Sequence, residues 1–270
     1  MTVLVLDTPE LAQKYDRLSN KQFEHGKLLI ADLAIEPGEK VLDLGCGTGR
    51  LSAHVAQLVG NRGAVYGADP LPLRIEVAKR RQGQHQNLHF AVTNANYLDL
   101  YADNTFDVVY LNSVFHWLVD KSAALQEIRR VLKPGGRLAI SAASKEKPHT
   151  FQLLLAELLQ QEPFNRFQNP RSSDGLVRLD IEETQALLAS HDFTIRSNEI
   201  KTFVDYFDEA HTVIDFSESS SFGNFLCSLP KAIKHQAQIA LQLLLENYRT
   251  PGGIELARNL IFTIAVNHKT

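Results

Sequence analysis

The stretch Val41-Leu42-Asp43-Leu44-Gly45-Cys46-Gly47-Thr48-Gly49, followed by Arg50-Leu51-Ser52-Ala53, decides the fold of this chain. A short apolar run that ends in alternating glycines predicts a buried strand, a tight turn and a helix N-terminus, where an α/β sheet receives a nucleotide-like ligand. Gly45 and Gly47 would let the backbone bend and let a ligand approach without Cβ contact. The dinucleotide fingerprint requires a glycine three positions after Gly47, but Arg50 stands there, which argues against NAD.

Composition and charge limit the classes of function. The chain has 270 residues and a formal net charge of -3, and it is long enough for one large α/β domain or a core with a smaller lid. It has no cluster of Lys and Arg, so neither a nucleic-acid partner nor a membrane partner is expected. Cys46 and Cys227 lie far apart, which suggests neither a disulfide framework nor a Cys-rich metal site, and no metal is expected.

The termini and the apolar runs bear on localisation. The N-terminus lacks the basic region of a signal peptide, and no apolar run approaches the roughly 20 residues that span a bilayer. We therefore expect a cytoplasmic protein, as a monomer or homodimer.

Alternating strand and helix signals continue along the chain. One or two amphipathic helices are expected over 8–33, starting with Thr8 as N-cap and Pro9 at the first helical position. Helix 74–81 is expected to point its charges mostly outward. Further strands are expected at 64–68, 88–92, 108–111, 138–141, 193–204 and 259–266, and further helices at 51–59, 120–132, 151–160, 181–190, 209–216 and 231–248.

The stretch Val41–Gly49 resembles motif I of the class I S-adenosylmethionine (SAM) dependent methyltransferases. Its form is that of the small-molecule branch, which includes the type 11, quinone-biosynthesis and trans-aconitate methyltransferases. Three more pieces resemble the family in order and spacing: Asp69, Asn112–Trp117 after the fourth strand, and Leu132-Lys133-Pro134-Gly135-Gly136. This resemblance covers residues 10–141 and implies SAM as cofactor, with S-adenosylhomocysteine as its product.

The resemblance implies an α/β fold: a Rossmann-like, seven-stranded, mostly parallel sheet with helices on both faces and an antiparallel last strand. Residues 1–145, 176–204 and 256–270 would form the SAM-binding core, with the N-terminal helix as part of a lid. Residues 146–175 and 205–255 would form a helical cap that binds substrate.

Several residues are expected to bind the cofactor. Asp69 stands 20 residues after Gly49, where one carboxylate matches the two ribose hydroxyls of an adenosine, although it could also cap a helix. At the position of Asn94 the family usually has an aspartate that accepts a hydrogen bond from the amino group of adenine. Asn94 could still bind this group, or it could form an Asx turn. With the residues that match the family motifs, the predicted cofactor site comprises Tyr15, Gln22, Asp43, Gly45, Cys46, Gly47, Gly49, Asp69, Pro70, Asn94, Ala95, Asn112 and Ser113.

The methyl acceptor is expected to bind beside the segment after the fourth strand, at Phe115, His116, Trp117 and Phe222. His116 is the candidate general base, because imidazole titrates near neutrality, but it could equally pack in the pocket wall. O-methylation of a hydroxyl or carboxylate is favoured over N- or C-methylation. A carboxylate acceptor would require a lid arginine, for which Arg166, Arg171 and Arg178 are available.

Two other classes of function stay open at this point. A SAM-binding regulatory protein without transferase activity would share the glycine turn but would have a closed acceptor cavity. A nicotinamide enzyme would use a similar sheet, although Arg50 argues against it. Methylation of arsenic would require clustered thiolates, which two separated cysteines do not provide.

Overall fold

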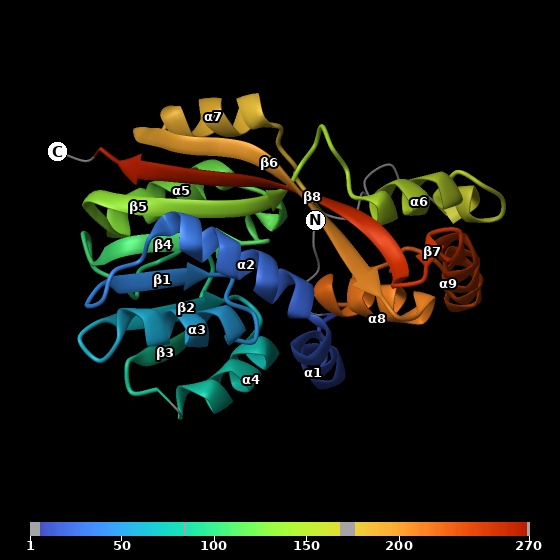
Figure 1. Cartoon of the computed structure of the whole chain (residues 1–270), viewed down its shortest axis with the longest axis horizontal. Coiled ribbons are helices and arrows are strands. Elements are labelled where there is room, and N and C mark those ends of the chain that lie inside the picture. Colours follow the sequence, from blue (N-terminus) through green and yellow to red (C-terminus); the bar gives the residue numbers. More distant parts are fainter. Residues whose placement is uncertain (1–5, 84, 168–175, 269–270) are drawn as a thin grey trace.

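A computed structural model describes residues 6–83, 85–167 and 176–268, and shows a mixed sheet with helices on both faces (Figure 1). The strands lie in the order β3-β2-β1-β4-β5-β8-β6, and the two-residue β7 pairs with β8. The strands are β1 Lys40–Leu44, β2 Ala64–Asp69, β3 Leu88–Val92, β4 Phe106–Asn112, β5 Leu132–Ala143, β6 Phe193–Phe207, β7 Arg249–Thr250 and β8 Gly253–Asn267. The helices are α1 Pro9–Leu18, α2 Asn20–Leu33, α3 Arg50–Val59, α4 Pro72–Gln82, α5 Lys121–Val131, α6 Thr150–Leu159, α7 Ile181–Ala189, α8 Ala210–Ser220 and α9 Lys231–Glu246, with 3₁₀ turns η2 Phe115–Trp117 and η3 Phe164–Phe167.

The sheet is parallel from β3 to β5, and β8 then runs antiparallel between β5 and β6. This confirms the predicted antiparallel last strand. The central strands are apolar on both faces because helices cover both. Helices α2 and α3 cover one face of the sheet with side chains such as Leu29 and Val55. Helices α5 and α7 cover the other face with side chains such as Ile128 and Leu188.

Three details of the strands differ from the expectation. β8 begins at Gly253 and β6 ends at Phe207, so their pairing runs from Phe193 to Phe207 and is longer than predicted. The additional β7 was not predicted, because a two-residue strand has no periodicity to detect. The expected turn at Lys133–Gly136 lies within the bounds of β5, with Gly135 at φ +73°.

The long β6–β8 hairpin carries a second body of helices. Its far end packs with α6, α8 and α9 in an apolar cluster separate from the two that flank the sheet. Phe207, Ile254 and Leu256 join the hairpin to this cluster. Figure 1 shows β8 twisting continuously from the sheet into these helices. The division into core and cap domains stays a prediction.

Two helices at the N-terminus cover the sheet and the glycine turn. Thr8 Oγ1 accepts a hydrogen bond from the Leu11 N–H at 3.2 Å, as expected of the N-cap. Helix α1 ends at Leu18, and the chain continues through Ser19 into α2, whose Gly26 faces the end of β4. A Cβ on Gly26 would lie 2.7 Å from both Asn112 Nδ2 and Leu51 Cδ2. Within the described ranges, no helix is long and apolar enough to cross a membrane.

Gly26→Ala tests this close approach. In an exposed helix, the change from glycine to alanine stabilises by about 1 kcal/mol. Here the added methyl group would collide with Asn112 and Leu51, so we expect urea unfolding to show a loss of about 1–3 kcal/mol. A gain in stability would show that α2 does not pack against β4 as described.

Candidate active site

The glycine turn after β1 is held against the end of β2. Gly45, Gly47 and Gly49 have φ values of +78°, +54° and +76°, a region that disfavours side chains. The N–H groups of Gly45 and Cys46 both donate to the Ala68 carbonyl, at 2.7 and 3.1 Å. A Cβ on Gly45 would also lie 2.3 Å from Val114 Cγ2. The turn therefore requires glycine both for its backbone conformation and for its contacts.

Asp69, at the end of β2, is buried beside this turn. Its Oδ2 accepts from the Gly47 N–H and its Oδ1 from the Leu71 N–H, each at 2.9 Å. Burial raises the pKa of Asp69 to about 6, although these two hydrogen bonds lower it. Burial likewise raises the pKa of Asp43, whose Oδ2 accepts from Ser52 Oγ at 2.5 Å, to about 7. Two carboxyl groups that titrate near neutrality thus lie at the cofactor end of the sheet.

A cavity lies between the glycine turn and the N-terminal helices. Gln22 Oε1 faces no hydrogen-bond donor among the described residues although it is buried, and the Gln22 carbonyl accepts from Asn112 Nδ2 at 3.1 Å. An orphaned buried acceptor fits the ammonium group of SAM, so these residues suit the cofactor that the motifs imply. The cavity is lined by Tyr15, Ser19, Gln22, Phe23, Asp43, Gly45, Cys46, Thr48, Arg50, Leu51 and Asn112.

The other predicted cofactor residues, Asp69, Gly47 and Gly49 among them, are not among those that line this cavity. Asn94 is exposed, and its Oδ1 accepts from the Asn96 N–H at 2.9 Å, which is the Asx turn that the sequence analysis left open. The Ser113 N–H donates to the Ser141 carbonyl at 2.9 Å. Pro70 follows Asp69 directly, and Ala95 is buried beside Asn94. Their roles toward SAM remain predictions.

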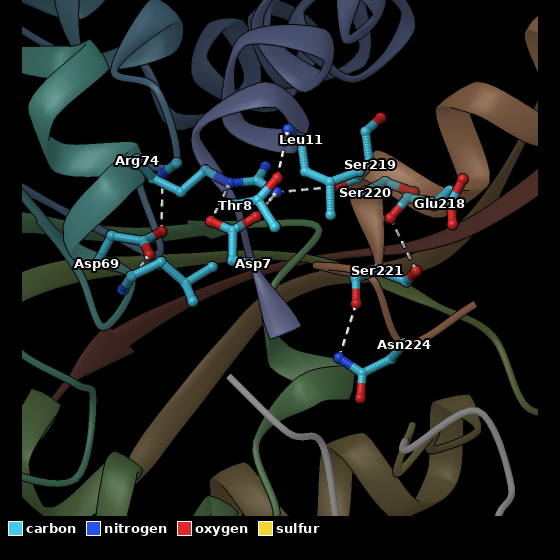
Figure 2. Close-up of polar contacts among 12 residues, drawn as sticks. Asp7, Thr8, Leu11, Asp69, Arg74, Glu218, Ser219, Ser220, Ser221 and Asn224 are labelled. Carbon is cyan, nitrogen blue, oxygen red and sulfur yellow. Dashed lines mark hydrogen bonds and ion pairs between the residues drawn. The ribbon is translucent and has the colours of Figure 1, made fainter. Parts of the chain in front are cut away.

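Arg74 joins three segments of the chain over Asp69 (Figure 2). Its guanidinium binds Asp7 with two hydrogen bonds of 3.0 and 2.8 Å, and donates to the Ser219 carbonyl at 2.7 Å. Its side chain is 1% exposed and that of Asp7 is 3% exposed. The guanidinium also faces the rings of Tyr15 and Phe222. Helix 74–81 was expected to point its charges mostly outward, and Glu76, Lys79 and Arg80 are exposed; Arg74 is the exception, because α1 and α8 cover it.

The predicted acceptor residues fall into two groups. Trp117 and Phe222 are in contact, with ring centroids 4.9 Å apart. Phe115 and His116 line a second cavity on the α7 side of the sheet, together with Lys121, Ile140, Ala142, Val177, Leu179, Thr184, Ile261 and Thr263. Of the lid arginines, Arg166 is exposed and paired with Glu162, and Arg171 lies outside the described residues.

His116 is held as a neutral ring. Its Nδ1 accepts from the Ala143 N–H at 3.1 Å. Burial, and then the charges of Arg178, Lys121 and Arg258, lower its pKa to about 3. Because Nδ1 uses its lone pair, the proton of the neutral ring lies on Nε2. This arrangement fits a hydrogen-bond donor better than the expected general base.

Comparison with known proteins decides the family. Residues 35–204 match the family described as the Methyltransferase domain. The chain belongs to this family. It is a SAM-dependent methyltransferase, as motif I, Asp69 and the sheet order all indicated.

Named relatives refine this assignment. The chain is 33% identical over 205 residues to the ubiquinone/menaquinone biosynthesis C-methyltransferase UbiE of Haemophilus ducreyi, covering 73% of this chain and 76% of that one. It is 37% identical over 137 residues to the 2-phytyl-1,4-naphtoquinone methyltransferase of Trichormus variabilis, covering 48% and 60%. The YcgJ protein of Bacillus subtilis has the same fold, with a TM-score of 0.63, 17% identity and coverage of 92% and 100%.

These relatives do not support the expected preference for O-methylation. The first is named as a C-methyltransferase, and carbon was the less favoured acceptor atom in the sequence-based interpretation. The sequence analysis found no motif for the acceptor atom, so its preference for oxygen did not rest on residues of a binding site.

Several site residues were not singled out from the sequence: Asp7, Arg74, His149, Asp205 and Arg258. Each is a polar or charged side chain whose burial depends on contacts with distant segments. For Arg74 a signal existed, since it stands five residues after Asp69 on the next helix. The pairing of β6 with β8 brings Asp205 and Arg258 together, whereas Asp7 is placed by Arg74 and His149 by its hydrogen bond from the Asn259 N–H.

The buried carboxylates predict how cofactor affinity depends on pH. If the ionised form of Asp69 accepts from two ribose hydroxyls, as expected, a pKa of about 6 means that a proton must be lost before binding at lower pH. We expect the Kd for S-adenosylhomocysteine, measured by calorimetry, to be lowest above pH 7 and to rise up to about tenfold per pH unit below pH 6. Asp69→Asn should bind weakly and should lose this dependence around pH 6. A constant Kd of the unmodified protein between pH 5 and 8 would contradict the assignment.

The Arg74–Asp7 pair predicts how the N-terminal segment is held. Asp7→Asn would leave a buried guanidinium without its counter-charge, a loss that costs about 3–5 kcal/mol where the site cannot open. Since this site is made by a terminal segment, we expect faster hydrogen exchange in α1 and little change in β8. Asp215→Asn is the matched control, because Lys14–Asp215 joins α1 to α8 at a half-exposed position and should contribute little. Equal effects of the two variants would contradict the role of Arg74.

Proposed function

We propose that the protein transfers the methyl group of SAM to a ring carbon of a small, oxygenated acceptor of the quinol kind. The observation that carries the proposal is the 33% identity, over about three-quarters of both chains, to a relative named as a quinone-biosynthesis C-methyltransferase. The second relative, also named for a naphthoquinone, supports the same acceptor class.

The residues around the glycine turn would hold the cofactor. Gln22 Oε1 would accept from its ammonium group, Asp69 from its ribose, and the glycines would let it lie against the backbone. The bound cofactor supplies an electrophilic methyl group on a positively charged sulfur. What remains for the protein is to align the acceptor with that methyl group and to exclude water, and such alignment can lower a barrier by about 7–11 kcal/mol.

The cap and the N-terminal helices would form the closed chamber. Tyr15 lies against Gly47, and Arg74 holds the segment before α1 and the end of α8 together. Trp117 and Phe222 add an aromatic wall between η2 and the cap, which suits a flat ring. An ionised hydroxyl on that ring makes the adjacent carbon nucleophilic, so the reaction requires no strong base. This agrees with a His116 whose Nδ1 lone pair is already used.

The test is the position of the new methyl group. We expect that SAM labelled with ¹³C in its methyl group, incubated with the protein and with reduced short-chain benzoquinones or naphthoquinones, gives a product whose label is bonded to a ring carbon in two-dimensional NMR. Asp69→Ala is the control that should abolish turnover, because it removes the ribose contact.

Two results would contradict the proposal. A labelled methoxyl group would show O-methylation, which the sequence analysis favoured. Turnover with unrelated acceptors but with no quinol would show that the acceptor class is wrong.

A further inference from the structure

Two histidines close the staggered ends of the sheet. β4 ends at Asn112, opposite Ser141, so the N–H of Ala143 at the end of β5 has no partner on β4. His116 Nδ1 accepts that hydrogen bond at 3.1 Å. β5 in turn ends at Ala143, and in the same way the N–H of Asn259 on β8 donates to His149 Nδ1 at 3.0 Å. Each histidine ring therefore accepts a hydrogen bond that the neighbouring strand, had it continued, would have accepted.

The two rings lie close to one another. Their backbone donors are the N–H groups of Ala143 and Asn259, which lie on adjacent strands because Ala143 pairs with Leu260, the residue after Asn259. The pKa of His149 lies well below its usual range because of burial and then the charges of Arg258, His116 and Arg178. The pKa of His116 is likewise lowered by burial and then by the charges of Arg178, Lys121 and Arg258. The charges of Arg178 and Arg258 thus act on both rings.

Both rings present the same nitrogen as a donor. A neutral imidazole that accepts at Nδ1 carries its proton on Nε2. Neither Nε2 is hydrogen-bonded by any residue within 6–83, 85–167 and 176–268. Because the backbone N–H groups of a strand do not move, this tautomer and orientation are fixed before any ligand arrives. Fixed donors of this kind are the arrangement that stabilises an oxyanion.

Charges near the rings favour an anion. Arg258 Nε donates to Asp205 Oδ2 at 2.5 Å, and His25 Nε2 lies 3.4 Å from Asp205 Oδ1. Burial raises the pKa of Asp205, but His25 and Arg258 outweigh it and lower the pKa to about 2. Asp205 is thus paired with Arg258 and His25. Its charge raises the pKa of His149, but burial and the charges of Arg258, His116 and Arg178 outweigh it.

We propose that His116 and His149 donate through Nε2–H to one ionised oxygen of the methyl acceptor, which makes a phenolate or an enolate the substrate class of this site. This inference rests on the proposed function, since the ionised oxygen is what makes the neighbouring carbon nucleophilic. That carbon forms the bond to the methyl group while the electron pair of the broken C–S bond stays on sulfur. The carbon then loses its hydrogen as a proton to water, which restores the aromatic phenolate.

The experiment uses 4-nitrophenol, whose anion is yellow, with the full-length protein saturated with S-adenosylhomocysteine. If two donors face the oxygen, the anion binds in preference to the neutral phenol, and the apparent pKa of the bound dye falls below that of the free dye. Absorbance titration of the complex measures this shift without any turnover.

Paired substitutions separate the donor from the structural role. Asparagine places its Oδ1 where Nδ1 stood, so His116→Asn and His149→Asn keep the backbone hydrogen bond and remove the Nε2 donor. Glutamine places an N–H₂ near Nε2 and loses the backbone contact. We expect each Asn variant to bind the anion roughly 10- to 100-fold more weakly, as for loss of one hydrogen bond to a charge, and each Gln variant to retain more of the affinity. His89→Asn, on β3 at the other end of the sheet, is the control and should change nothing.

The outcomes distinguish this inference from the proposed function. A lowered dye pKa that the Asn variants abolish supports the donor pair, whichever atom of the acceptor is methylated. A dye that binds equally in both forms, that does not bind, or that binds to the Asn variants as to the unmodified protein would overturn it. Methylation at carbon together with any of those results would leave the proposed function standing without the donor pair.

Discussion

Hydrogen bonds from one glycine turn to the end of β2 hold the cofactor end of this protein together. Gly45 and Cys46 donate to the Ala68 carbonyl, and Gly47 donates to the carboxylate of Asp69. The turn can make these bonds only in the left-handed backbone region, which explains its glycines. One consequence is electrostatic: burial beside the turn raises the pKa of the Asp69 carboxyl group to about 6, although the hydrogen bonds that it accepts from Leu71 and Gly47 lower it.

The other end of the sheet, beside α6, α8 and α9, depends on a different constraint, the continuity of the β6–β8 hairpin. The same two strands that complete the sheet extend, still paired, into the cluster of α6, α8 and α9. A helical cap that is joined to a core by paired strands has a defined position, unlike one that is joined by loops. Arg258 and Asp205 lie where the hairpin leaves the sheet, so the polar groups of this side are placed by strand register.

The parts of the structure that the sequence predicts are those encoded by local pattern. The glycine turn, the 88–92 strand and the Thr8 cap depend on neighbours in the chain, and each lies where expected. The length of the β6–β8 pairing and the burial of Arg74 depend on segments that lie far away in sequence, and period and composition do not report on these. His149 illustrates the limit: its position before a helix suggested no function, and only the end of β5 beside it shows what the ring does.

The strand ends at this edge of the sheet form steps. β5 extends past β4, β8 extends past β5, and a histidine stands at each of these two steps. A strand rises about 3.3 Å per residue and its side chains alternate between faces. One residue more or less in β5 would therefore shift the step beside it by that distance and turn the last side chain to the other face of the sheet.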